Sequence, residues 1–384
     1  MNIALRLCLV CTLAAIPARA QVDFRFSGYA VNFPVYQHSN SLVSAFLGTK
    51  PDQFLNMTRL RLRPSLGLWT NAFLNIEYEV TTTYFSSALF FQPSPLQNRG
   101  QIVDLTWQPD VGRNHWAVAH FIDRLYVRHT SDALDVTIGR QRISWGTGRI
   151  WNPTDLFNPI NPTTFAKLEK DGIDAAAIKI IFGNFTDLSV VINPHREFQG
   201  TDFGIRFRTN TYGFDFALLG GAFDESFVFG GDFAGSVFDA GIRGEGIFST
   251  AKTGSRPGYG KFILGVDNQF TEDWYALLEY HFNGRGASSI LEYDLLSLIQ
   301  GDILNLGRHF IAIQSTFLLH PLLTLTGGYT NSVTDGSGFI LGSLSYSADE
   351  RITISLGSQI FHGETFDEFW YYPSSIYGRI DYFF

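Results

Sequence analysis

Residues 56–84 contain two groups of charged side chains, and within each group the charges fall at every second position. Arg59, Arg61 and Arg63 alternate with leucines, and Glu77 and Glu79 follow at the same spacing after a short Trp-Thr-Asn turn. Side chains two apart in an extended chain share one face, so each set lines one face of a strand. Guanidinium stays ionised and can hold a carboxylate or phosphate through two parallel hydrogen bonds. The two sets predict either cross-strand ion pairs or a positive surface that attracts anions.

The same alternation runs through the rest of the chain and places further charges opposite the apolar stripes. For most of these residues we favour ion-pair ladders, each pair contributing modestly in a wet environment. Arg59, Arg61 and Arg63 exceed Glu77 and Glu79 by one charge, so this cluster is the best candidate for a positive patch. The other side chains expected on the same, water-facing side are Arg124, Arg128, Arg206, Arg208, Arg243 and Glu245.

The elements that carry these charges are segments of about ten residues with period-two alternation, which is typical of strands that cross a membrane. They predict an all-β fold, a transmembrane antiparallel β-barrel of about 18 strands. Connections alternate between short and long, as expected for short periplasmic turns and long outer loops. Segment 226–233 is the least distinct strand. Without it and one neighbour, 16 strands remain an alternative.

The composition agrees with one barrel rather than several soluble domains. The 384 residues are 15% aromatic and 17% charged, and 37 are glycine. Residues 1–20 resemble a signal peptide, with Arg6, an apolar core over 7–16 and a small-x-small site ending at Ala20. Both cysteines, Cys8 and Cys11, lie in this segment. The expected organisation is therefore a leader, 1–20, and one cysteine-free outer-membrane barrel, 21–384.

The net charge argues against a nucleic-acid partner. The chain has 28 basic and 36 acidic residues, and loss of Arg6 and Arg19 with the leader changes the sum to 26 − 36 = −10. No spacing of His, Cys, Asp or Glu specifies a metal site, and no cofactor is expected. The histidines form no local Ser-His or Asp-His motif, so a membrane-embedded enzyme is the less favoured class, although distant residues can converge in a fold.

A long irregular segment, 145–171, interrupts the strands. It holds three Asn-Pro pairs, which forbid both helix and continued ladder pairing. A loop of this length in a compact fold is usually functional. We expect it to fold inward and set the constriction. Its charges nearly balance, so any anion preference should come mainly from the wall. The candidate constriction residues are Trp145, Arg149, Trp151, Asn152, Asp155 and Lys167.

Two further patterns indicate the compartment. Residues 376–384 alternate apolar side chains and end in Phe384. This resembles the C-terminal strand by which the barrel-assembly machinery recognises outer-membrane barrels. The expected partners are that machinery, outer-membrane lipid and lipopolysaccharide, and a small polar solute. The sequence does not indicate an oligomeric state.

Gly139-Arg140-Gln141, Trp145-Gly146, Arg149 and Asp171-Gly172 together resemble the alginate-export and related porin-like channel families of Gram-negative outer membranes. The match covers about 35 residues, 138–172. It implies a barrel with an arginine-rich lumen and a long loop after this strand. The Asn-Pro-rich insert departs from the family pattern, so alginate itself is not implied.

These observations favour a porin-like outer-membrane channel for passive or facilitated diffusion of small polar, and by the lumen arginines anionic, solutes. Two alternatives stay open. One is a substrate-specific exporter or importer of an anionic saccharide. The other is a surface-binding barrel whose lumen the loop closes completely.

Overall fold

The structure is a computed structural model that describes residues 23–87, 100–109, 115–158, 169–198, 200–223, 226–251, 257–295, 298, 303 and 305–384. The expected leader, 1–20, and the candidate residue Lys167 lie outside the described residues.

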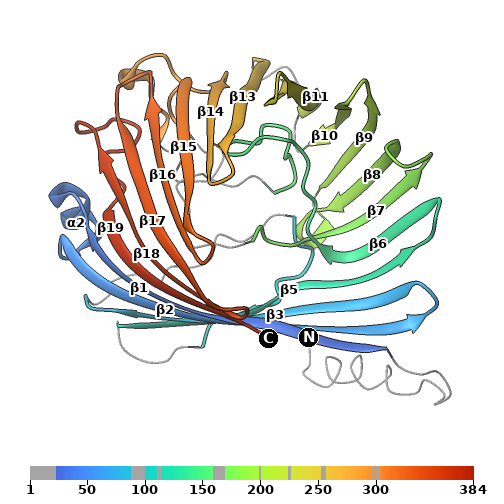
Figure 1. Ribbon diagram of the computed structural model, residues 1–384, viewed down its shortest axis with the longest axis horizontal. Coiled ribbons are helices and arrows are strands. Elements are labelled where there is room, and N and C mark those ends of the chain that lie inside the picture. Colours follow the sequence, from blue (N-terminus) through green and yellow to red (C-terminus); the bar gives the residue numbers. More distant parts are fainter. Residues whose placement is uncertain are drawn as a thin grey trace.

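The described strands form one sheet that closes on itself (Figure 1). Each wall strand pairs antiparallel with its neighbours in the chain, and β1 pairs with both β2 and β19 to close the ring. The strands are β1 (Phe24–His38), β2 (Asp52–Trp69), β3 (Ala72–Phe85), β4 (Thr106–Trp107), β5 (Trp116–Thr130), β6 (Leu134–Gln141), β7 (Ile173–Ile181), β8 (Asp187–Pro194), β9 (Thr201–Thr211), β10 (Phe214–Phe223), β11 (Ser226–Val237), β12 (Ala240–Ala251), β13 (Tyr259–Thr271), β14 (Trp274–Asn283), β15 (His309–His320), β16 (Leu323–Ser332), β17 (Gly338–Asp349), β18 (Ile352–His362) and β19 (Ser374–Phe383).

The prediction of an all-β barrel of 18 strands is confirmed, because every strand of the described ring except β4 spans the wall. The least distinct segment, 226–233, is part of a full strand, β11. β4 was not predicted, because two residues are too few to show an alternation. It pairs with β5 at Phe121 and His120, beyond the end of β6. β6 ends at Gln141, before the irregular segment 145–171 begins.

Helices in the described residues are short. They are α2 (Ser41–Leu47) and the 3₁₀ turns η2 (Arg196–Phe198) and η3 (Ile290–Glu292). None of the described helices has the length and apolar character needed to cross a membrane. The wall carries apolar side chains on its outer face, and Leu218 on β10 is 71% exposed.

Where the ring closes, backbone groups near the two ends of the chain form hydrogen bonds with each other. Phe384 donates its amide to the carbonyl of Gly28 at 3.1 Å, and Gly28 donates to the Phe384 carbonyl at 2.8 Å. A barrel without an open edge leaves no row of unpaired amides and carbonyls, which is the condition for a sheet in a bilayer.

One irregularity in the wall decides which charges point inward. The pairing of β3 with β5 shifts between Glu77 and Tyr78, because Glu77 pairs with Arg124 whereas Tyr78 pairs with Ile122. Asp123 is the extra residue of this bulge. Both Asp123 and Arg124 are therefore buried inside the barrel, although neighbours on a regular strand would face opposite sides.

Candidate functional site

The chain between β6 and β7 enters the barrel (the teal-green segment inside the ring in Figure 1). Glu245 on β12 fixes its course, because one carboxylate accepts three backbone hydrogen bonds from the loop. The amides of Thr147, Gly148 and Thr154 lie 2.5, 3.1 and 3.2 Å from its oxygens. A segment that starts beside β6 therefore reaches the inner face of β12, several strands away around the ring.

Glu279 on β14 holds the next turn of the loop in the same manner. It accepts from the amides of Arg149, Ile150 and Trp151 at 2.9, 3.1 and 2.7 Å. Glu245 is 4% exposed and Glu279 is 1% exposed, so both carboxylates are sealed beneath the loop. Irregular backbone inside a fold must find hydrogen-bond partners, and an ionised carboxylate can accept several. The two wall glutamates thus supply partners for six loop amides.

Aromatic packing fixes the loop beside these hydrogen bonds. The Trp151 ring stacks on His281 of β14, with centroids 5.3 Å apart and an 18° interplanar angle. Trp145 meets Phe157 edge to face at 5.1 Å, within a buried cluster on the β7–β12 side. Gly204 on β9 makes room for it, because a Cβ there would lie 2.7 Å from the Trp145 ring. Two predicted constriction residues, Trp145 and Trp151, are therefore buried anchors of the loop.

The returning end of the loop binds the opposite side of the wall. Glu169 forms an ion pair with Arg63 of β2, and the Lys170 carbonyl accepts from Arg124 of β5 at 2.5 Å. Lys170 also pairs with Asp155, which joins the two ends of the loop. Asp155 is 2% exposed and so is a buried structural acid. Asn152 acts through its carbonyl, which accepts the Asp155 amide at 3.1 Å.

The arginine cluster on β2 is neutralised by more acids than the alternation predicted. Arg61 lies 2.8 Å from Glu77 and 2.9 Å from Glu79, and it also pairs with Asp123. The expected excess of one positive charge is wrong for this reason: the bulge adds Asp123 and the loop adds Glu169. Four cations and four carboxylates form the cluster, namely Arg59, Arg61, Arg63 and Arg124 with Glu77, Glu79, Asp123 and Glu169.

The other predicted wall arginines also have acidic partners on the wall. Arg206 lies 3.0 Å from Asp232, and Arg208 lies 2.8 Å from Asp187. Arg128 pairs with Asp135, and Arg243 pairs with Asp267. These contacts match the ladder interpretation of the sequence. The Arg128 and Arg208 side chains remain 51% and 44% exposed, so they keep contact with water while paired.

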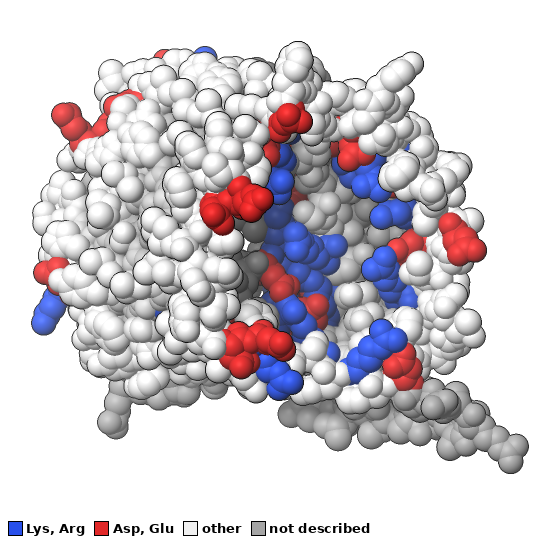
Figure 2. Space-filling model, in the orientation of Figure 1, with Lys and Arg blue, Asp and Glu red and all other residues white. Residues whose placement is uncertain are grey.

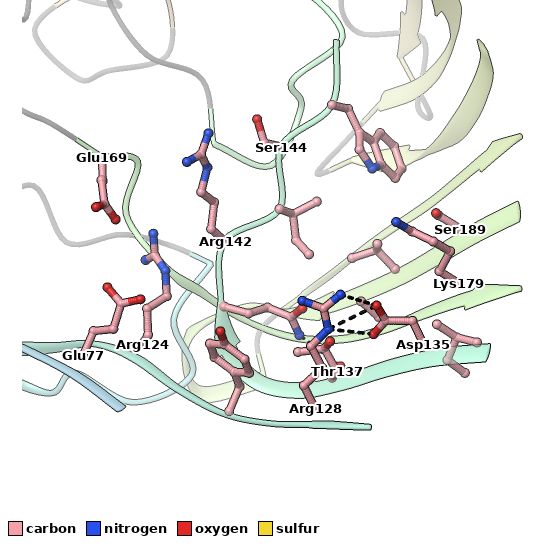
Figure 3. A pocket seen from close by; sticks show the side chains of 17 residues that line it. Glu77, Arg124, Arg128, Asp135, Thr137, Arg142, Ser144, Glu169, Lys179 and Ser189 are labelled. Carbon is pink, nitrogen blue, oxygen red and sulfur yellow. Dashed lines mark hydrogen bonds and ion pairs between the residues drawn. The ribbon is translucent and has the colours of Figure 1, made fainter. Parts of the chain in front are cut away.

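A cavity of about 400 Å³ lies between β5–β8 and the start of the loop (Figure 3). Arg128 and Asp135 are joined in its wall, and Lys179 projects from β7 beside them. Arg142 enters it from the loop. Among the described residues, no carboxylate lies within ion-pair distance of Arg142, Arg149 or Lys179. Figure 2 shows basic side chains gathered deep in the opening of the barrel.

Alternation therefore predicts the side of the wall on which the charges lie, but it does not predict several of their roles. Asp123 was missed because a bulge cannot be read from alternation. Arg142 continues the sequence alternation of the apolar Ile138. It lies after the end of β6, so strand alternation does not apply to it. Glu245 was predicted to line the water-filled interior, but it is covered by the loop.

Another buried carboxylate, Glu368 in the connection between β18 and β19, joins outer loops. It accepts from the Asn305 side chain at 3.0 Å and from the amides of Leu306 and Gly307 at 2.7 Å each. The Glu368 amide donates to Asp335 at 2.7 Å. Three outer connections therefore meet at this residue, those before β15, between β16 and β17, and before β19.

The contact of these three outer connections at Glu368 is expected to be more stable at acid pH. Burial raises the pKa of Glu368 to about 7, although hydrogen bonds from Asn305, Gly307 and Leu306 favour its charged form. The opened loop, with an ordinary glutamate, binds fewer protons between about pH 4.5 and 7. The free energy of opening is therefore largest below that range and falls as the pH rises through it.

Hydrogen exchange of residues 305–307, corrected for intrinsic rates, should show greater protection at pH 5 than at pH 8. Glu368→Gln should remove the difference, whereas Glu364→Gln, an exposed acid of the same loop, should keep it. Equal protection of the wild-type protein at both pH values would contradict the expectation.

No family model matches the chain, and no curated protein matches it. Solved structures do. OccAB3 of Acinetobacter baumannii has a TM-score of 0.58 at 7% identity, over 94% of this chain and 99% of that one. A BenF-like porin from Pseudomonas fluorescens Pf-5 has a TM-score of 0.57 at 9% identity, over 94% and 98%.

A third neighbour is OccK2 (OpdF) of Pseudomonas aeruginosa, solved in complex with glucuronate. It has a TM-score of 0.55 at 10% identity, over 94% of this chain and 98% of that one. The sequence identity between these structures and this chain is 10% or less, whereas the structural match covers 94% of this chain. The expected resemblance to an outer-membrane channel barrel is confirmed at this level: the chain has the fold of Gram-negative outer-membrane porins.

Proposed function

We propose that this protein is a porin-like channel of a Gram-negative outer membrane, and that segment 145–171 forms its constriction. The observation that carries the proposal is the attachment of the loop across the lumen by Glu245 and Glu279. A loop that only covered the mouth would need no partners on the inner face of the wall. The proposed setting includes outer-membrane lipid and lipopolysaccharide, and assembly through the strand that ends at Phe384.

The proposed solutes are small, polar and preferably anionic. The carboxylates that pair with the wall arginines neutralise them. The preference therefore rests on Arg142, Arg149 and Lys179, which lack a described acidic partner. Arg142 and Arg149 are exposed and lie on the connection between β6 and β7, Arg142 just before segment 145–171. Cations at a narrow point, where the surrounding protein has a low dielectric, select strongly by sign. The sequence-based expectation was that the wall would supply any anion preference, whereas only Lys179 of these three cations lies on a wall strand.

A substrate-specific channel for an acidic saccharide is the second candidate. The cavity beside Arg128 and Lys179 has the volume of a small-molecule site, about 400 Å³. The neighbour OccK2 was solved with glucuronate, a sugar with a carboxylate. Glucuronate should then block the current at low concentration, whereas glucose should not.

Single-channel recording in planar bilayers tests the proposal. The expected result is a steady ohmic current whose reversal potential in a salt gradient shows preference for chloride over potassium. Absence of current from folded, heat-modifiable protein would overturn it and favour a plugged surface-binding barrel.

A further inference from the structure

At three places on the wall a tyrosine hydroxyl forms a hydrogen bond with a histidine ring on a nearby strand. We call these contacts the outward Tyr–His pairs, namely Tyr78–His120, Tyr280–His309 and Tyr329–His362. The distances from the hydroxyl oxygen to the ring nitrogen are 2.9, 2.7 and 3.1 Å, in that order. The first pair joins β3 and β5, and the other two lie on β14–β18, farther around the ring (Figure 1).

Strand pairing places these side chains on the outer, lipid-facing side of the wall. Tyr280 pairs directly with Ile311, and Tyr329 pairs directly with Ile340. Both isoleucines are exposed, as are the apolar side chains along the outside of the barrel. Tyr78 lies between two glutamates that point into the lumen, so it points outward. The histidines follow because side chains two positions apart on a strand share a face.

All three histidines lie at one height, near the outer edge of the membrane. Each is level with the residue eight positions beyond the short-turn end of its hairpin, over the spans 72–80, 274–282 and 323–331. Eight residues of about 3.3 Å, on a strand tilted by roughly 40°, rise about 20 Å. The apolar band of such a barrel is about 25 Å tall. His309 begins β15 and His362 ends β18, so the wall itself ends at this height.

Each histidine has a second ring nitrogen that no other described residue binds. The Tyr329 hydroxyl accepts from the Asn331 side chain at 3.2 Å, so its own hydrogen is available for His362. We assign the same direction, from phenol to imidazole, to all three pairs. The remaining nitrogen of each neutral ring then carries a hydrogen and is a donor. A donor at the edge of hydrocarbon costs free energy unless an acceptor meets it.

The surrounding outer wall supplies no such acceptor. We compared the outward positions of six described stretches of β13–β18, namely 260–269, 275–283, 309–318, 323–332, 338–347 and 352–362. None of these positions carries Asp, Glu, Lys or Arg, so His309 and His362 are the only side chains there that can become positively charged. The described histidines that form ion pairs are others, His38 and His195. An acceptor for the outward Tyr–His pairs must therefore come from the membrane.

We propose that the outward Tyr–His pairs bind the phosphate groups of lipid A, the membrane anchor of lipopolysaccharide. A phosphate oxygen accepts from an imidazole N–H, and its negative charge also stabilises the protonated ring. The pairs lie on the side of the long connections, where the outer leaflet carries this lipid. Three pairs at one height present donors at several points around the barrel. The inference rests on the outer-membrane location in the proposed function, but not on conduction.

Lipid binding to the folded, purified barrel tests this proposal. Bisphosphorylated lipid A should raise the heat-modification midpoint of the wild-type protein, whereas dephosphorylated lipid A and phosphatidylglycerol should have little effect. His120→Phe/His309→Phe/His362→Phe should lose most of the rise, because phenylalanine keeps a ring but has no N–H. His129→Phe/His320→Phe makes the same change near the short turns and should keep the rise.

Three results of this experiment would overturn the proposal. They are no rise in the wild-type protein, an equal rise in the triple variant, and an equal rise with phosphatidylglycerol, which would replace lipid A by any anionic lipid.

Nitrogen-15 NMR of histidine-labelled wild-type protein needs no variant to fold. Lipid A should shift the second ring nitrogens of His309 and His362. It should leave His281 unchanged, because that ring is buried and stacked between Trp151 and Phe310. Unshifted outward histidines, or an equal shift of His281, would contradict phosphate binding. A barrel that binds lipid A but passes no current would refute the channel and leave this inference standing.

Discussion

Replacing both Glu245 and Glu279 with alanine is expected to raise the single-channel conductance several-fold and to make the current noisy. The two carboxylates accept six backbone hydrogen bonds from residues 147–154. A hydrogen bond to a charged group contributes about 1.5–3 kcal/mol, and a buried amide left without an acceptor is costly. The loop should therefore leave its position against β12 and β14, and the lumen should widen.

Single-channel recordings of the double variant and of Asp187→Ala provide the comparison. Asp187 is also a buried wall carboxylate, but it pairs with Arg208 and accepts no described hydrogen bond from the loop. Its removal should leave the conductance near the wild-type value. Deletion of 147–165 should raise the conductance at least as much as the double substitution. A folded double variant and a folded deletion that both conduct like the wild-type protein would show that the loop does not limit the current.

Neutralising Arg142 and Arg149 is expected to abolish most of the preference for anions while changing the conductance much less. Both side chains are exposed on the inward loop, and no described carboxylate lies within ion-pair distance of either. Unscreened charge at a constriction acts on every passing ion, whereas paired arginines on the wall are largely compensated.

Reversal potentials in a potassium chloride gradient should shift toward the non-selective value in Arg142→Gln/Arg149→Gln. Lys50→Gln/Arg351→Gln removes the same charge from exposed positions on connections between strands, and it should leave the reversal potential unchanged. An equal shift in both variants would assign the selectivity to overall charge rather than to the loop.

The arginine cluster on β2 shows which contacts are predicted by the alternation of residues and which are not. Alternation placed Arg59, Arg61 and Arg63 on the inner face, and their ion pairs with Glu77 and Glu79 follow directly from strand pairing. It gave the wrong charge balance, because Asp123 reaches the cluster through a bulge and Glu169 reaches it from a loop. Neither contact has a periodic signature in the sequence.

The sequence by itself determined the barrel, the faces of the wall and the place where a long loop interrupts it, and it left 16 or 18 wall strands. Local rules suffice for these features, because a side chain's face depends on residue parity and a strand's end on turn and proline chemistry. Only the tertiary structure decided where the loop lies and which cations stay without a partner. Those outcomes depend on contacts between residues as far apart in the chain as Trp151 and Glu279. Ring closure brings such residues together, and no local pattern encodes the distance between them.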